Sequence, residues 1–173
     1  MTAVTARLTP MLALVLVLYA STACAQSERE TTDAIRFIWQ NMPEHCYIFK
    51  STFGDTTVSS YLSDGSANIV MLGVRAMQFN AQRGTSKDLT LSLAFNPADI
   101  SGIRLVPGSG PGQAGAFFVD CPGDNKCVYF SGTEQMVNRG MLNICGSVSD
   151  VERIGRALNH LKQFAKPTPK PAF

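Results

Sequence analysis

The stretch from Ala114 to Gly132 constrains the fold most, because two cysteines flank a turn between two apolar runs. The runs Phe117–Val119 and Val128–Phe130 consist of aromatic and β-branched residues, which are typical of strands. The Pro-Gly-Asp-Asn sequence between them is typical of a chain reversal. We therefore predict a β-hairpin in which Cys121 and Cys127 face each other and form a disulfide.

A C-x5-C pair could instead supply half of a metal site. His45 and His160, the two histidines, lie far from the pair in sequence. One isolated cysteine pair falls short of the four ligands that structural zinc requires. We therefore favour the disulfide and expect no metal and no cofactor.

The first 25 residues have the features of a secretory signal peptide. Arg7 precedes the apolar run Met11–Ala20, and an Ala-x-Ala cleavage site follows at Ala23 and Ala25. The apolar run is shorter than the about 20 residues that cross a bilayer. We therefore predict a signal peptide over residues 1–25, no transmembrane span after its removal, and a periplasmic or secreted bacterial protein.

An alternative reading makes Cys24 a lipid-modified N-terminus, as in bacterial lipoproteins. That signal usually has leucine where this chain has Ser21, so we favour simple cleavage, which leaves Gln26 as the first residue.

Export determines how the cysteines are interpreted. Removal of Cys24 leaves four of the five cysteines: Cys46, Cys121, Cys127 and Cys145. An even number in an oxidising compartment predicts two disulfides, for which there are three pairings. If Cys121 pairs with Cys127, the second bridge joins Cys46 to Cys145.

Length and charge limit the class of protein. The mature chain has 173 minus 25, or 148, residues, which fits one domain, and we place it at 26–165, followed by a flexible Pro-rich tail at 166–173. Without Arg7 it has 14 basic and 13 acidic residues, a charge of +1. This balance does not predict binding to nucleic acid.

Helical periodicity predicts a helix at each end of the domain. The first runs from Ser27 to Met42, with Trp39 on its apolar face. The last runs to Phe164 after a capping box at Ser149 and Glu152. Its apolar stripe contains Val151, Ile154, Leu158, Leu161 and Ala165.

Between the helices, the pattern favours strands. Asp88–Phe95 alternates apolar and polar residues, as a strand with one buried face does. The turn residues of Ser63–Ser66 separate two β-rich segments, and Gly73 indicates a bulge in the second. Met136–Cys145 is expected to be the last strand. The Gly-rich segment Pro107–Gly112 precedes a strand and not a helix, so we expect a flexible loop and no phosphate site.

The chain contains none of the motifs that identify common hydrolases, such as Gly-x-Ser-x-Gly or His-Glu-x-x-His. His45 and Cys46 are neighbours, so on a strand their side chains point to opposite faces and form a poor catalytic dyad. His160 lies off the apolar stripe of the last helix. We therefore predict no catalytic residues and a protein that is not an enzyme; a hydrolase with a dispersed site is the less favoured alternative.

The order of these elements resembles small exported bacterial domains of pleckstrin-homology-like architecture. The resemblance rests on P-A-D-I-x-x-I (Pro97–Ile103), D-C-P-G-D-N-K-C-V (Asp120–Val128) and the final helical segment Arg153–Leu161. It implies an α+β fold, in which a strongly bent antiparallel sheet or open barrel of about seven strands has an N-terminal helix and a C-terminal capping helix. It also implies a non-enzymatic interaction module. Some relatives bind lipid head groups through a basic loop, and here Arg83 and Lys87 are the basic residues near the candidate loops.

The sequence therefore predicts an exported, non-enzymatic binding domain of the bacterial envelope. Its partner would be a protein, a peptide or an envelope component. The alternative is a small carrier of apolar ligands with a lipocalin-like barrel, which predicts an enclosed apolar cavity of a few hundred Å³.

Overall fold

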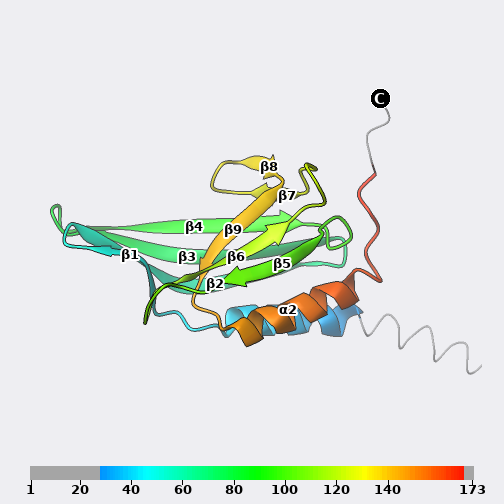
Figure 1. The fold of residues 1–173 in the computed structure, drawn as a ribbon, viewed down its shortest axis with the longest axis horizontal. Helices are drawn as coiled ribbons and strands as arrows, with labels where there is room; N and C mark the ends of the chain where they lie inside the picture. The colour runs from blue at the N-terminus through cyan, green and yellow to red at the C-terminus, as the bar shows by residue number, and fades with distance from the viewer. Residues whose placement is uncertain (1–27, 170–173) are drawn as a thin grey trace, which may run out of the picture.

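Residues 28–169, which the computed structural model describes, form two helices and nine strands in an α+β arrangement (Figure 1). The predicted signal peptide, Cys24 and residues 170–173 lie outside this range. Residues 28–40 are helical, and the helix α2 spans Val148–Leu161. The strands are β1 (Cys46–Ser51), β2 (Gly54–Ser66), β3 (Ile69–Asn80), β4 (Thr85–Phe95), β5 (Gly102–Val106), β6 (Gly115–Asp120), β7 (Val128–Phe130), β8 (Gln135–Val137) and β9 (Arg139–Ile144).

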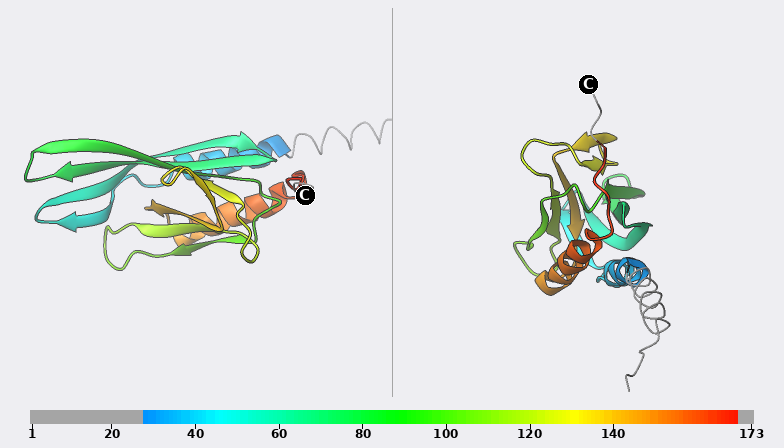
Figure 2. Two further views of the ribbon diagram at one scale, coloured as in Figure 1. Left: turned by 90° about the horizontal axis from the view of Figure 1, so that it is seen from above. Right: turned by 90° about the vertical axis from the view of Figure 1, so that its right-hand side faces the viewer.

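The strands form two antiparallel sheets that face each other. One sheet has six strands in the order β1-β2-β3-β4-β7-β8, and the other has three in the order β5-β6-β9. The helix at residues 28–40 and α2 lie side by side along one open side of the two sheets (Figure 2). The result is not a closed barrel, and nine strands in two sheets replace the predicted single sheet of about seven.

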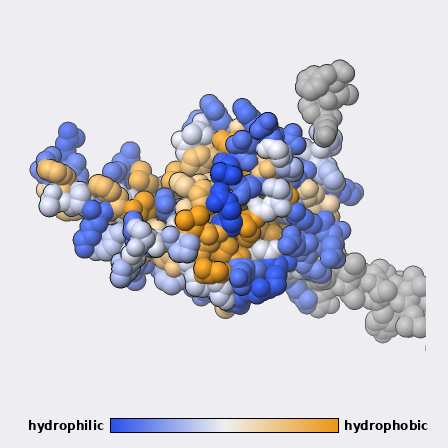
Figure 3. Space-filling model, viewed as in Figure 1, coloured by the Kyte–Doolittle hydropathy of each residue, from blue (hydrophilic) through white to orange (hydrophobic). Residues whose placement is uncertain are grey.

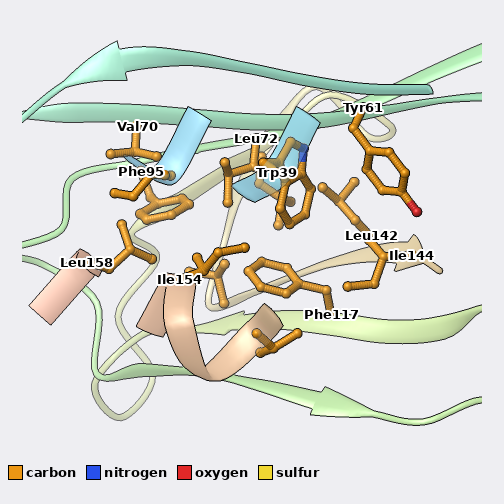
Figure 4. Close-up of a cluster of buried hydrophobic side chains, with 14 of the residues drawn as sticks. Trp39, Tyr61, Val70, Leu72, Phe95, Phe117, Leu142, Ile144, Ile154 and Leu158 are labelled. Atoms are coloured by element: carbon orange, nitrogen blue, oxygen red, sulfur yellow. The ribbon is translucent and has the colours of Figure 1, made fainter. Parts of the chain in front are cut away.

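The core lies between the two sheets and the helices, as Figure 4 shows. Alternate residues of each strand point into it: Leu72 from β3, Phe117 from β6 and Leu142 from β9 are all fully buried. Trp39 packs edge-on against Phe117, with ring centroids 5.0 Å apart, and against Tyr61 at 5.8 Å. The predicted apolar faces of both helices are confirmed, since Trp39 and α2 residues Val151, Ile154, Leu158 and Leu161 are buried. α2 ends at Leu161 and not at the predicted Phe164, so Ala165 of the predicted stripe lies beyond the helix.

The predicted hairpin between Phe117–Val119 and Val128–Phe130 is wrong. β6 pairs with β5 and β9 in the three-stranded sheet, whereas β7 pairs with β4 and β8 in the other. The disulfide-closed loop Cys121–Cys127 therefore carries the chain from one sheet to the other. The number of paired residues explains this choice: β6 pairs with β9 over six residues, whereas β7 has only three residues with which it could pair.

Two predicted interruptions of the long strands are also wrong. β2 runs straight through Ser63–Ser66, and the chain turns after it, at residues 67–68. Gly73 lies in an unbroken ladder, and the bulge is instead in β2, between Val58 and Ser60. Close approach of the neighbouring strands favours glycine at this position, because a Cβ would lie 3.2 Å from the Leu91 carbonyl oxygen and 3.3 Å from Ser92 Cβ. The Gly73 carbonyl accepts a hydrogen bond of 2.9 Å from the indole Nε1 of Trp39.

The chain after β7 also differs from the prediction in detail. The expected strand Met136–Cys145 is divided at Asn138 into β8 and β9, which belong to different sheets. The capping box of α2 uses Ser147 and Asp150 and lies two residues before the predicted pair. Ser147 Oγ accepts from the Asp150 N–H, and the Asp150 carboxylate accepts from the Ser147 N–H.

Both pairs of cysteines are bonded. One disulfide joins Cys46 at the start of β1 to Cys145 just after β9, and the other joins Cys121 to Cys127. The first therefore links the two sheets at one end of the core. Disulfides fit an oxidising, exported environment.

The tyrosine beside the first disulfide gives a pH-dependent prediction. Tyr61 Oη accepts a 2.7 Å hydrogen bond from the Cys145 N–H, and burial raises the pKa of Tyr61 to about 12. Its ordinary pKa is about 10, so between pH 10 and 12 the unfolded chain loses this proton while the folded chain keeps it, and the free energy of unfolding falls as pH rises. From pH 9 to 11 we expect urea denaturation to show about 1.4 kcal/mol more loss in the wild type than in Tyr61→Phe. Equal losses would contradict the assignment.

Candidate functional site

Four strands of the larger sheet project beyond the rest of the molecule at one end (Figure 1, left). β2, β3 and β4 have 13, 12 and 11 residues, whereas β5, β6 and β9 of the opposing sheet have 5, 6 and 6. At about 3.3 Å per residue, the excess of about six residues leaves roughly 20 Å of sheet without an opposing layer among residues 28–169. We call residues 49–56 and 77–88 the arm.

The arm ends in two turns that lie side by side. Residues 52–53 connect β1 to β2, and residues 81–84 connect β3 to β4. The Ala81 N–H donates a 3.0 Å hydrogen bond to the Phe53 carbonyl, and Gly54 pairs with Asn80. Gly84 has φ of 61°, a conformation that favours glycine. Backbone hydrogen bonds therefore hold the two turns together as one tip.

The arm exposes large apolar side chains. Phe49, Phe53, Met77 and Phe79 are 60%, 66%, 44% and 41% exposed. Alternate residues of β3 face the core, where Ala76 is buried. The same face of β3 continues into the arm as Gln78 and Asn80, which are exposed. Figure 3 shows apolar side chains mixed with polar ones on this projection. Single exposed apolar residues are ordinary on a protein surface, but several gathered on one projection are typical of an interaction site.

One face of the arm forms a shallow hollow of about 280 Å³. Its lining combines the aromatic ring of Phe49 with the polar side chains of Thr56 and Gln78 and the basic side chains of Arg83 and Lys87. Arg83 and Lys87 are exposed, and the structure shows no salt bridge for either within residues 28–169. The lining also contains Asp55, so the hollow offers apolar contact together with two basic side chains and one acidic side chain.

A second hollow lies at the other end of the larger sheet, beside the turn between β2 and β3. It measures about 820 Å³ and is lined by Ile69, Phe95 and Met136 together with polar residues that include Asp99. The chain's own C-terminal stretch forms one wall: Thr168 donates its N–H to Asp99 Oδ1 at 3.2 Å. Both hollows lie at the surface and have polar lining, while packed side chains fill the space between the sheets.

The outer face of the three-stranded sheet carries a cluster of charged side chains that form salt bridges with one another. Arg104 Nε lies 3.0 Å from Asp120 Oδ2, and Arg139 is bonded to the other oxygen of the same carboxylate. The Arg104 guanidinium also stacks over Phe118, 4.0 Å from the ring centroid. These are cross-strand pairs that stabilise the sheet.

The residues considered for catalysis lie apart. Cys46 is buried in its disulfide at the start of β1, and its neighbour His45 is exposed immediately before the strand. His160 lies on α2, where its ring packs edge-on against Phe164 at 5.5 Å. Among residues 28–169 no three His, Cys, Asp or Glu side chains are grouped to hold a metal ion. Over the same range no helix is long and apolar enough to cross a membrane.

The Gly-rich segment Pro107–Gly112 has a structural role in the body. Gly112 accepts a 2.7 Å hydrogen bond from the Tyr47 N–H, and the Tyr47 carbonyl accepts one of 2.7 Å from Ala114. The segment thus covers the outer edge of β1 where β1 leaves the body.

Sequence reasoning placed Arg83 and Lys87 near a candidate loop, and the structure places both in the arm. It did not identify the exposed aromatic residues Phe49, Phe53 and Phe79, because the composition of a β-rich segment does not show which part of it lacks an opposing layer. A signal was present in the mismatch of lengths: the β-rich segments before Phe95 are longer than those after it, so part of them has no opposing layer.

The fold and this site define an α+β domain of two facing antiparallel sheets with a projecting apolar arm. No family model matches the chain, and comparisons with curated proteins and with solved structures give no match either.

Proposed function

We propose that the protein is an exported, non-enzymatic binding domain of the bacterial envelope and that the arm is its binding surface. The observation that carries this proposal is the exposure of Phe49, Phe53, Met77 and Phe79 on a projecting sheet. Full burial of a side chain of this size against a partner contributes roughly 1.5–3 kcal/mol, so these four have enough apolar area to anchor a complex.

Support for export comes from two independent features. The first 25 residues have the pattern of a signal peptide, and the two disulfides fit an oxidising compartment. The pleckstrin-homology-like resemblance, with α2 packed against the sheets, supports an interaction module over an enzyme. Mature protein in the periplasm or outside the cell would present the arm to envelope components.

The arm also suits binding for a mechanical reason. Within the arm, the β2–β3 ladder is regular from the Val58–Ala76 pair to the Gly54–Asn80 pair, and the β3–β4 ladder is regular to the Asn80–Thr85 pair at the tip. The aromatic side chains are therefore held on a backbone that is already ordered before a partner binds. Pre-organisation of this kind lowers the entropy cost of association.

The test compares an arm variant with a matched control. In Phe49→Ser/Phe53→Ser/Phe79→Ser, we expect components captured from an envelope extract by the wild type to be lost. Their affinity, measured afterwards with the purified component, should fall at least tenfold per residue removed. Phe37→Ser is the control, because Phe37 is 64% exposed on the helix at residues 28–40, away from the arm. It should bind as the wild type does.

Two results would contradict the proposal. In one, the arm variant and Phe37→Ser retain the same components at the same affinity, which would remove the arm as the binding surface. In the other, the purified protein turns over generic esterase or peptidase substrates at a rate that Cys46→Ala or His160→Ala abolishes. That result would make the protein an enzyme.

A further inference from the structure

β4 has an open edge along the arm. On one side it pairs with β3 over all eleven of its residues, but on the other side it pairs with β7 only through Leu93–Phe95. No strand among residues 28–169 pairs with the other side of Thr85–Leu91. These seven residues make about 23 Å of free strand edge. Figure 1 shows the upper edge of β4 without a neighbour there.

The hydrogen bonds of Ser92 show which backbone groups of β4 point toward the open edge. The Ser92 N–H donates to Ser131 Oγ at 2.7 Å, and the Ser92 carbonyl accepts from the Ser131 N–H at 3.0 Å, so both groups point away from β3. Hydrogen-bonding direction repeats every second residue in an antiparallel strand. The N–H and C=O groups of Thr90, Asp88 and Ser86 therefore also point outward. The free edge presents three donors and three acceptors in a straight row.

We propose that this edge binds an extended peptide segment of the partner, which adds to β4 as a further antiparallel strand. This inference rests on the proposed function and names the partner's chemistry. The β3–β4 register has no bulge over its eleven pairs, and the free stretch contains no proline. A bulge or a proline normally protects a sheet edge, and here the protection that remains is the charge of Lys87 and Asp88. Such an edge is a template for a strand whose charges are complementary.

The side chains beside the edge define what the peptide should carry. Lys87, Leu89 and Leu91 point to the inner face of the larger sheet; Lys87 lines the hollow of the arm, and Leu91 packs against the core. A peptide residue opposite Lys87 should therefore be acidic, and those opposite Leu89 and Leu91 should be aliphatic. On the outer face, the residue opposite Asp88 should be basic.

A second copy of this chain is disfavoured at this edge by charge. Symmetric antiparallel pairing that uses all of Thr85–Leu91 is centred on Asp88, which would lie directly opposite its own copy. Like charges in directly opposed positions destabilise a sheet. A peptide with a basic residue at that position replaces the repulsion with attraction.

The probe is a synthetic peptide, Val-Thr-Val-Lys-Glu-Thr-Thr, whose residues in order would lie opposite Leu91 through Thr85. We expect saturable binding to the full chain by NMR, with slower amide exchange at Ser86, Asp88 and Thr90. N-methylation of the second, fourth and sixth peptide residues, whose N–H groups face β4, should abolish binding. N-methylation of the third and fifth residues should preserve it. Equal binding of both methylated peptides, or no slowing at these three amides, would overturn the proposal.

Two variants test the same geometry from the protein side. Thr90→Pro removes an N–H group that points outward and leaves the hydrogen bonds between β3 and β4 in place. It should lower the affinity for the peptide at least tenfold. Lys87→Glu should reverse the preference at the fifth peptide residue from glutamate to lysine. An unchanged affinity and an unchanged preference in these variants would count against strand addition.

The outcomes separate the two proposals. If the arm phenylalanine variant loses the envelope component while Thr90→Pro keeps it, strand addition is wrong and the binding function stands. If the phenylalanine variant keeps the component, the binding surface itself is wrong. A wild-type dimer in sedimentation that Thr90→Pro dissociates would assign the edge to a second copy and overturn the peptide proposal.

Discussion

Replacement of both Cys46 and Cys145 by alanine is expected to lower the free energy of unfolding by about 4–5 kcal/mol. The two residues are 99 positions apart, and their bond joins the first strand to the end of the last. In the chain-entropy model, a crosslink that closes a loop of about 100 residues removes about 4.7 kcal/mol of conformational freedom from the unfolded chain. This is a large part of the about 5–15 kcal/mol by which a domain is stable.

The second disulfide supplies the comparison. Cys121 and Cys127 are separated by six positions, so the same model gives about 2 kcal/mol for Cys121→Ala/Cys127→Ala. Urea denaturation of both double variants, followed by far-UV circular dichroism, measures the two losses under one condition. If the short bridge costs as much as the long one, the long bridge does not act mainly by restraining the unfolded chain.

Local pattern was sufficient to predict the elements whose neighbours are close in sequence. The apolar faces of both helices followed from helical periodicity, and the buried Trp39 and Leu158 confirm them. Asp88–Phe95 was recognised from strict alternation, and it forms most of β4. In these segments, burial and local propensity favour the same conformation, so the sequence alone was enough.

Partner choice between strands was not predictable in the same way. Phe117–Val119 and Val128–Phe130 have the composition of a hairpin, but each run pairs with strands from elsewhere in the chain. The predicted turn between them does form, but it connects the two sheets and does not close a hairpin. A hairpin between the two runs competes with pairings between strands that are distant in sequence. The total number of paired residues and the burial of residues such as Val128, which is fully buried, favour the distant pairings.

The candidate site was harder to predict than the fold for a related reason. An exposed phenylalanine in a strand looks the same in sequence as a buried one. Phe49 in β1 and Phe117 in β6 are both strand residues, yet one is 60% exposed and the other is fully buried. The difference comes from the opposing sheet, which ends before it reaches the arm, and that sheet is made of residues distant in sequence.

Under the proposed function, the part of the domain where the two sheets face each other provides stability, and the arm provides the binding surface. Both disulfides and the buried core lie where the two sheets face each other, whereas the arm is held by its hydrogen-bonded ladders and has no opposing layer. Substitutions at exposed arm residues should therefore change binding with little effect on the free energy of unfolding, since surface substitutions usually change it by less than about 0.5 kcal/mol. This separation is what makes Phe49, Phe53 and Phe79 suitable for the binding test.

Trp39→Ala is expected to lower the free energy of unfolding by about 3–5 kcal/mol, because the indole is fully buried between Tyr61 and Phe117. Trp39→Phe should lower the free energy of unfolding less, since it keeps most of the packing but leaves the Gly73 carbonyl without the indole N–H.

Trp39 is the one tryptophan of the chain, so far-UV circular dichroism has to replace tryptophan fluorescence in the urea titrations. Phe37→Ala, on the exposed face of the same helix, should change stability by less than about 0.5 kcal/mol. A loss in Trp39→Ala no greater than in Phe37→Ala would mean that this helix does not pack on the sheets.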